Sequence, residues 1–187
     1  MRTRLMLISH AATPAMREGR FPADDALDAR GAADAGAWPH RMSIGADAPV
    51  FCSPAAAALD TARALGFAVR IASELADADY GEWRGRRLAD VAGDARSEVE
   101  AWSRDPHAAP PRGESFEQVR ARVGGWLEQL DDAGDIVALT HAAVMRAAVV
   151  HALNAPSSSF ARIEIAPLSV LELRRSARGW TWWPARL

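Results

Sequence analysis

Short runs of consecutive apolar residues recur along the chain and alternate with segments in which apolar residues follow a helical spacing. Short, mostly apolar runs lie at residues 4–8 (RLMLI), 49–52 (PVFC), 67–72 (FAVRIA) and 135–140 (DIVALT). Runs of this length without polar alternation are typical of strands that are buried on both faces. Because strands and helical segments alternate, we predict an α/β fold: a three-layer αβα sandwich with a mostly parallel central sheet.

Capping residues mark the limits of the helical segments. In the alanine-rich segment, Ser53 suits an N-cap, Pro54 suits the first helical position and Gly66 suits the stop. Ser115 and Gln118 have the spacing of a capping box. The helices predicted in this way cover residues 29–38, 53–66, 115–130 and 142–154.

The C-terminal part of the chain has the pattern of closing strands. Residues 161–166, 169–175 and 179–184 are predicted strands, the last two forming a hairpin around residues 177–179. The polar, tryptophan-containing stretch at about 74–111 is interpreted as an excursion over one end of the sheet. We expect residues 1–187 to form a single domain, because the chain shows no long linker and its length suits one core.

Composition excludes several classes of protein. The net charge of −2 gives no overall attraction to nucleic acid or to a membrane surface, and no apolar run approaches the roughly 18 residues needed to span a bilayer. Cys52 is the only cysteine, which excludes an intrachain disulfide and a cysteine metal cluster. The N-terminus lacks a signal-peptide pattern, so we expect a cytoplasmic protein. All 22 basic residues are arginines, which can bind phosphate through two parallel hydrogen bonds.

Two segments of the chain have nearly the same pattern. Residues 5–13, LMLISHAAT, and residues 136–144, IVALTHAAV, each consist of an apolar run, a hydroxyl residue, a histidine and two alanines. His10 and His141 therefore follow predicted strands, at the end of a parallel sheet where ligands bind. His141 also precedes a predicted helix, whose free N–H groups favour an anion. If the two strands are neighbours, the pattern indicates a phosphoryl-transfer site; the alternative is that each histidine only ends a strand and bonds a loop.

The other histidines indicate no metal site. His40, His107 and His151 have no partners at ligand-like spacing, so we predict neither a metal ion nor another cofactor.

Five blocks of the chain resemble the histidine phosphatase superfamily, the phosphoglycerate-mutase-like enzymes. The blocks run nearly from end to end, in the order and spacing of that family. They are SHAAT with the following GRF (residues 9–13 and 19–21), SPAAAALDTA (53–62), LADADYGEWRG (75–85), PPRGESFEQVRARV (110–123) and THAAVMRA (140–147).

The resemblance assigns roles to individual residues. It implies that His10 is the nucleophile that becomes phosphohistidine and that His141 is the second histidine of the pocket. Asp77 takes the place of the family's acidic proton donor, which is normally a glutamate. Thr13 is expected at the rim of the pocket and Ala142, at the start of the helix, in the substrate-binding set.

The chain departs from the family pattern at the phosphate site itself. Ser9 stands where the family has an arginine before the nucleophile, and Ala57 stands where it has a second phosphate-binding arginine. Loss of one preorganised donor costs on the order of 10²–10³ in rate. We therefore weigh compensation by Arg20, from the loop after His10, and by Arg112 or Glu114, from the excursion; the alternative for each is a solvated surface side chain or, for Glu114, a helix-start acid.

Two functional hypotheses follow from these observations. The first is a metal-independent phosphomonoester hydrolase that acts on a small phosphorylated metabolite; the second is a degenerate member that binds inorganic phosphate, another anion or a partner protein without useful turnover. A Rossmann-type nucleotide-binding module is disfavoured, because no Gly-x-Gly-x-x-Gly segment follows a strand. If the terminal WTWW segment (180–183) leaves an exposed patch, we expect a homodimer.

Overall fold

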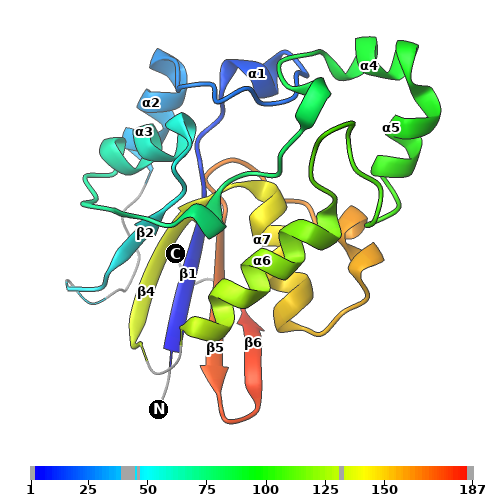
Figure 1. Cartoon of the computed structure of the whole chain (residues 1–187). Helices are drawn as coiled ribbons and strands as arrows, with labels where there is room; N and C mark the ends of the chain where they lie inside the picture. The colour runs from blue at the N-terminus through cyan, green and yellow to red at the C-terminus, as the bar shows by residue number, and fades with distance from the viewer. Residues whose placement is uncertain (1–2, 39–44, 46, 131–132, 185–187) are drawn as a thin grey trace.

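The computed structural model describes residues 3–38, 45, 47–130 and 133–184. Within these residues a six-stranded sheet forms the centre of the molecule (Figure 1), with the strand order β3-β2-β4-β1-β5-β6. The strands are β1 (Thr3–Ser9), β2 (Val50–Cys52), β3 (Arg70–Ile71), β4 (Asp135–Thr140), β5 (Val170–Ser176) and β6 (Gly179–Trp183).

Most neighbouring strands run in parallel, as predicted. The pairs β1–β4, β4–β2 and β2–β3 are parallel, whereas β5 runs antiparallel to both β1 and β6. The register places Ser9 beside Thr140 at the carboxyl ends of β1 and β4. The backbone N–H of His10 then donates to the carbonyl of Thr140 at 3.0 Å. The two segments of similar sequence, residues 5–13 and 136–144, are therefore neighbours, and their histidines follow the strands at the same edge of the sheet.

The helices are distributed over both faces of the sheet and beyond its edge (Figure 1). None of the described helices has the length and apolar character needed to cross a membrane. The α-helices are α1 (Pro14–Arg17), α2 (Ala29–Ala37), α3 (Ala56–Ala64), α4 (Leu88–Asp94), α5 (Arg96–Trp102), α6 (Phe116–Gln129) and α7 (Ala142–Ala152). Short 3₁₀ helices are η1 (Ser73–Leu75), η2 (Gly81–Trp83) and η3 (Ser157–Arg162).

Apolar side chains on the two faces of the sheet build two separate cores. Leu5 and Leu7 of β1 lie in the core formed with α6 and α7. Ile8 lies in the core formed with α3, because successive residues of a strand point to opposite faces. Burying a leucine or isoleucine side chain contributes roughly 1.5–3 kcal/mol. The two cores account for the continuous apolar runs, which would alternate with polar residues if one face met water.

A third, smaller apolar cluster holds the excursion that contains α4 and α5 (green, upper right in Figure 1). Phe21, Trp83 and Val91 are buried in it, and Tyr80 and Trp102 pack against them. The rings of Phe21 and Trp83 lie 5.3 Å apart. This cluster joins the loop after His10 to the excursion, so both segments are fixed beside the carboxyl ends of the strands.

Gly81 allows the excursion to approach the chain before α6 closely. Its φ of +50° is in the left-handed region, and a Cβ at this position would lie 2.1 Å from the carbonyl oxygen of Pro111. Only glycine avoids both the backbone strain and the clash.

Several predicted elements are confirmed. Residues 29–37 form α2, and the C-terminal hairpin is present. The capping box of α6 has both of its hydrogen bonds, between Ser115 and Gln118. Gly66 follows the C-cap of α3 with a φ of +74°, as a helix stop requires.

Three predictions about individual elements are wrong. Residues 161–166 do not form a strand: η3 occupies the first part, and both sides of β5 are already paired with β1 and β6. Of residues 67–72, only Arg70 and Ile71 are in a strand. Helix α3 begins at Ala56 rather than at Pro54: its N-cap is Ala55, and the Ser53 hydroxyl bonds the N–H of Ala55 and Nε2 of His141.

Candidate active site

Two histidine rings meet at the carboxyl ends of β1 and β4. The ring centroids of His10 and His141 lie 4.9 Å apart, with the planes inclined at 61°. Each histidine follows the last residue of its strand, and the parallel register of β1 and β4 sets the two rings side by side. The pairing predicted from the repeated pattern is therefore present.

A backbone carbonyl determines the protonation of His10. Its Nδ1 lies 2.7 Å from the carbonyl oxygen of Ala11. Because a carbonyl can only accept, Nδ1 carries the proton and Nε2 keeps a free lone pair. The Thr61 hydroxyl accepts from the N–H of Ala11 at 3.0 Å and donates to the carbonyl of Ala57 at 2.7 Å. Thr61 thus holds Ala11, the residue whose carbonyl orients the ring, and Nε2 is the ring nitrogen with an available lone pair.

His141 is bonded through its other ring nitrogen. Its Nε2 lies 2.8 Å from the Ser53 hydroxyl, which also accepts from the N–H of Ala55 at 3.2 Å. Among the described residues the hydroxyl proton has no acceptor other than Nε2, so we assign the hydroxyl as the donor and the ring proton of His141 to Nδ1. Nδ1 lies 3.6 Å from Asp77 and has no hydrogen-bond partner within the described part of the chain. This arrangement makes His141 a buried N–H donor beside His10.

Both histidines are neutral at pH 7. Burial is the main cause that lowers the pKa of His10, with a further contribution from His141. Burial also lowers the pKa of His141 to about 4, and the Arg122 guanidinium adds to this effect. A neutral His10 is the nucleophilic form, because protonation would occupy the Nε2 lone pair.

Asp77 has the properties of a proton donor. Burial raises the pKa of its carboxyl to about 6, although the N–H of Ala78, at 2.9 Å, and the Arg122 guanidinium oppose the rise. A carboxyl with a pKa near 6 is partly protonated at neutral pH and can give up and take back a proton. The shorter aspartate does reach this site, since it lies 3.6 Å from His141.

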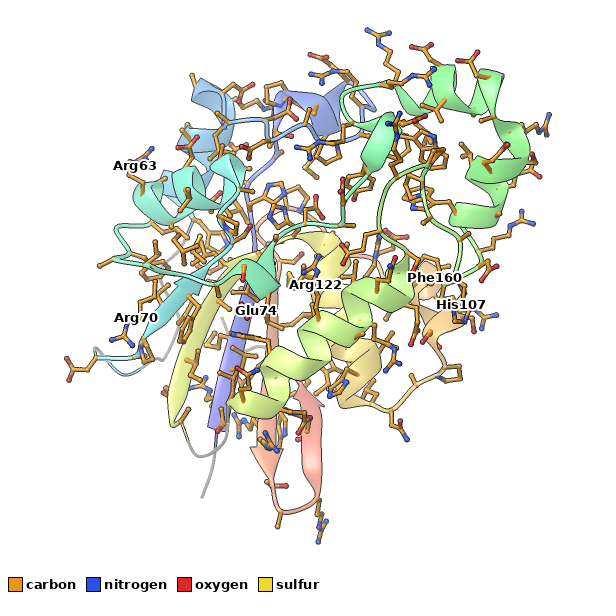
Figure 2. The ribbon with its side chains drawn as sticks, in the orientation of Figure 1. Arg63, Arg70, Glu74, His107, Arg122 and Phe160 are labelled. Atoms are coloured by element: carbon orange, nitrogen blue, oxygen red, sulfur yellow. The ribbon has the colours of Figure 1, made fainter. Side chains whose placement is uncertain are left out.

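Arg122 holds the segment that carries Asp77. Figure 2 shows Arg122 on α6 close to Glu74 on η1. Its guanidinium donates to the carbonyl of Glu74 at 2.7 Å and to the carbonyl of Asp77 at 3.0 Å, and it makes two 2.9 Å bonds to the Glu114 carboxylate. Sequence reasoning missed Arg122. The sequence signal that could have identified it is an arginine on the inner face of a capped helix.

A cavity of about 410 Å³ opens beside the two histidines and Asp77. Its volume lies within the usual range for small-molecule sites. Its other lining residues are Thr13, Met16, Pro22, Asp24, Asp25, Pro54, Ala55, Ala57, Ala76, Ala78, Asp79, Tyr80 and Arg84. The segments that follow β1, β2 and β4 and the excursion therefore share one site.

The other predicted site residues lie at different distances from this cavity. Thr13 lines it, and its hydroxyl caps α1 by accepting from the N–H of Met16. The Ser9 hydroxyl instead donates to the carbonyl of Ala166 at 2.6 Å and accepts from Ser169, and Ser9 is not part of the lining. Ala142 begins α7 and is not among the lining residues.

Arg20, Arg112 and Glu114 were considered as substitutes for the missing phosphate-binding arginines. None of these three side chains lines the cavity. Arg20 binds Glu18 at 2.8 Å and lies 3.6 Å from Asp25. Arg112 is exposed and paired with Glu82. Glu114 has the structural role described for Arg122.

Among the described residues, Arg84 is the one arginine that lines the cavity. It lies just after η2, and its side chain is 53% exposed and 3.9 Å from Asp79. Sequence reasoning missed it, because no spacing rule connects this arginine to the histidines.

No metal site is evident in residues 3–38, 45, 47–130 and 133–184, which contain no group of three or more potential ligands placed to hold an ion. His107 is exposed and His151 bonds Glu128, while His40 lies outside the described residues.

Comparison with known proteins assigns the family. Residues 5–183 match the histidine phosphatase superfamily (branch 1), and the chain belongs to that superfamily. The match extends from β1 to β6 and so includes both histidines and Asp77.

Individual relatives are moderately similar. A bifunctional protein of Mycobacterium tuberculosis is 29% identical over 182 residues, which cover 91% of this chain and 50% of that protein. The chain thus spans about half the length of the first curated relatives it matches. The adenosylcobalamin/alpha-ribazole phosphatase of Escherichia coli is 28% identical over 167 residues, covering 83% of this chain and 82% of the enzyme. The structure of mycobacterial glucosyl-3-phosphoglycerate phosphatase superposes with a TM-score of 0.82 at 22% identity and covers 100% of both chains.

Proposed function

We propose that this protein is a metal-independent phosphomonoester hydrolase that acts through a phosphohistidine on His10. The observation that carries the proposal is the pairing of a nucleophile and an acid. His10 keeps a free Nε2 lone pair, and Asp77, whose pKa is raised to about 6, lies across the same cavity. The relatives that are phosphatases support a phosphorylated metabolite as the substrate class.

In the first step, Nε2 of His10 forms a bond to phosphorus as the bond from phosphorus to the leaving oxygen breaks. Protonated Asp77 gives its proton to that oxygen, and the alcohol departs. His141 donates from Nδ1 to the transferring phosphoryl group, where a preorganised donor in a buried site is most effective.

In the second step, the Asp77 carboxylate takes a proton from water as the water oxygen attacks phosphorus. The bond between phosphorus and Nε2 breaks, inorganic phosphate leaves, and His10 and Asp77 return to their starting protonation states. The intermediate pKa of Asp77 suits both directions of proton transfer.

The phosphate contacts in this proposal differ from the family pattern. Ser9 and Ala57 stand where that pattern has arginines, and Arg84 is the guanidinium on the cavity lining among the described residues. Further donors are Nδ1 of His141 and the free N–H groups at the start of α7. We propose that these donors bind the phosphoryl group, with lower affinity than two buried arginines would provide.

The alternative is a degenerate member that binds an anion or a partner protein without useful turnover. The observation that favours it is the presence of Ala57, 5% exposed, on the lining at a position the family fills with an arginine. A homodimer also remains a proposal, supported by the 50% and 42% exposure of Trp182 and Trp183 on the edge strand β6.

The deciding experiment measures hydrolysis of p-nitrophenyl phosphate, without added metal, by the wild type and by His10→Ala, Ala57→Arg and Ser9→Arg variants. Turnover by the wild type that His10→Ala abolishes supports the hydrolase. A silent wild type that becomes active on Ala57→Arg would support the degenerate alternative. Ser9→Arg serves as a comparison: its new side chain must displace two partly buried hydrogen bonds, so this variant should be less stable without gaining activity.

A further inference from the structure

The cavity carries an unusual balance of charge for a phosphate site. Within the described part of the chain, its charged lining residues other than the histidines are four aspartates and one arginine: Asp24, Asp25, Asp77, Asp79 and Arg84. Asp77 is partly protonated near neutral pH, but the other three aspartates leave the mouth negative. A cleft lined by one sign of charge attracts ligands of the opposite sign and repels those of the same sign.

Two of these aspartates have their own positive partners. Asp79 faces Arg84 at 3.9 Å, and Asp25 faces Arg20 at 3.6 Å. Asp24 instead accepts from the N–H of Ala56, and no ion pair of its carboxylate occurs among the described residues. Asp24 is therefore the carboxylate with the least charge compensation at the mouth of the cavity.

Asp24 acts on the same space as the histidines. Its field raises the pKa of His141 against the stronger effect of burial, so its carboxylate lies within electrostatic reach of that ring. His141 is 3% exposed, and its Nδ1 lacks a hydrogen-bond partner among the described residues. Both residues line the same cavity. The N–H of His141 needs an acceptor, which a phosphate supplies, and the Asp24 carboxylate favours a positive charge on the rest of the ligand.

The histidines do not neutralise a phosphate dianion, since both are uncharged at pH 7. A substrate with a second negative group would meet the aspartates at the mouth. A substrate with an ammonium group would place positive charge against them and leave its phosphate beside His10 and Arg84. Selection by repulsion of the wrong ligand is as effective as attraction of the right one.

From these charges we infer that the substrate is a phosphate monoester whose alcohol part carries a positive charge, held at the cavity mouth by Asp24 and Asp25. This inference rests on the proposed hydrolase function and names the substrate class of the same site. Esters of anionic alcohols, such as phosphoglycerates, are disfavoured by the same two carboxylates.

The test compares two substrates of the same shape. Phosphocholine and 3,3-dimethylbutyl phosphate differ only in a quaternary nitrogen or carbon, and phosphoglycolate supplies an anionic third substrate. We expect kcat/KM, from phosphate release at pH 7 and low ionic strength, to be about tenfold higher for phosphocholine than for the neutral ester, and lowest for phosphoglycolate. In the double variant Asp24→Asn/Asp25→Asn, the ratio of kcat/KM for phosphocholine to kcat/KM for the neutral ester should fall toward one.

The matched control is Asp94→Asn, which removes an aspartate that is 71% exposed on α4 and outside the cavity lining. In this control variant, the ratio of kcat/KM for phosphocholine to kcat/KM for the neutral ester should equal the wild-type ratio. Equal rates for the two matched substrates in the wild type would overturn the cationic subsite and leave the hydrolase intact.

Binding separates failure of the subsite from failure of the hydrolase. Calorimetric titration of the His10→Ala variant with the two matched esters measures charge preference without turnover. If no ester is hydrolysed by the wild type but phosphocholine binds this variant more tightly, the subsite stands and the hydrolase falls. If hydrolysis and charge-dependent binding are both absent, both proposals are overturned.

Discussion

The carboxyl ends of β1 and β4 have nearly the same sequence but hold their histidines in different ways. His10 bonds the carbonyl of the next residue, Ala11, through Nδ1. His141 bonds a side chain from another part of the chain, Ser53, through Nε2. The first arrangement leaves Nε2 as an acceptor at the cavity, and the second leaves Nδ1 as a donor. Identical residues thus acquire complementary chemistry because their hydrogen-bond partners differ.

The difference also concerns rigidity. The partner of His10 is a backbone group that Thr61 secures, whereas the partner of His141 is a single hydroxyl. A backbone carbonyl cannot be removed by substitution, but the hydroxyl can. Substitutions around the two rings should therefore have unequal effects, in the order that follows.

Replacing His10, the proposed nucleophile, should have the largest effect. His10→Ala should lower kcat by about 10⁴-fold or more, because no covalent intermediate can form. His141→Ala removes one donor to the transition state and should cost about 10²–10³. Rapid quenching in alkaline detergent with labelled substrate should detect phosphoenzyme in the His141 variant and none in the His10 variant. A labelled His10→Ala protein would contradict the assignment.

Removing the acid should come next. Asp77→Asn should lower kcat about 10²–10⁴-fold. In the proposed mechanism, kcat/KM of the wild type depends on neutral His10 and protonated Asp77. It should therefore fall above pH about 6 as Asp77 ionises, and fall at lower pH as His10 takes up a proton. The decrease at high pH should be absent in the variant. Its persistence would show that another group is the acid.

Substituting Arg122 should move that pH limit rather than abolish activity. Arg122→Met removes the guanidinium that lowers the pKa of Asp77, so the decrease at high pH should shift upward. Loss of its charged hydrogen bonds should also lower the free energy of unfolding by about 2–3 kcal/mol. Arg120→Met, on the same helix but paired with Glu117, is the control and should leave the pH profile unchanged.

The smallest expected effect is at the hydroxyl that orients His141. Ser53→Ala leaves Nε2 buried without its partner and should lower the free energy of unfolding by about 1–2 kcal/mol, with less than a tenfold loss of kcat. Chemical denaturation measures the first quantity. The control is Ser73→Ala, at an exposed hydroxyl bonded to Glu74, which should change neither the free energy of unfolding nor kcat. Equal effects of the two substitutions would show that Ser53 does not position the ring.

The fold was largely predictable because local signals and core formation agree. The apolar runs at 4–8 and 135–140 are strands with both faces covered, and Ser115 with Gln118 starts α6 as its spacing requires. The prediction was wrong at residues 161–166, where Ile163 and Ile165 alternate with polar residues. There the carbonyl of Ile163 accepts from Arg146, and the apolar side chains pack against the core without strand pairing.

The sequence by itself determined the candidates for chemistry at this site: two histidines after two strands and, through the family resemblance, an acid in the third block. Those assignments depend on local order along the chain, which the strand and helix signals preserve. Only the tertiary structure decided that Arg84, rather than Arg20 or Arg112, lies on the cavity and that Ser53 and Arg122 orient the groups around it. Long arginine side chains reach whichever carboxylate or carbonyl packing brings near, so sequence spacing does not encode their partners.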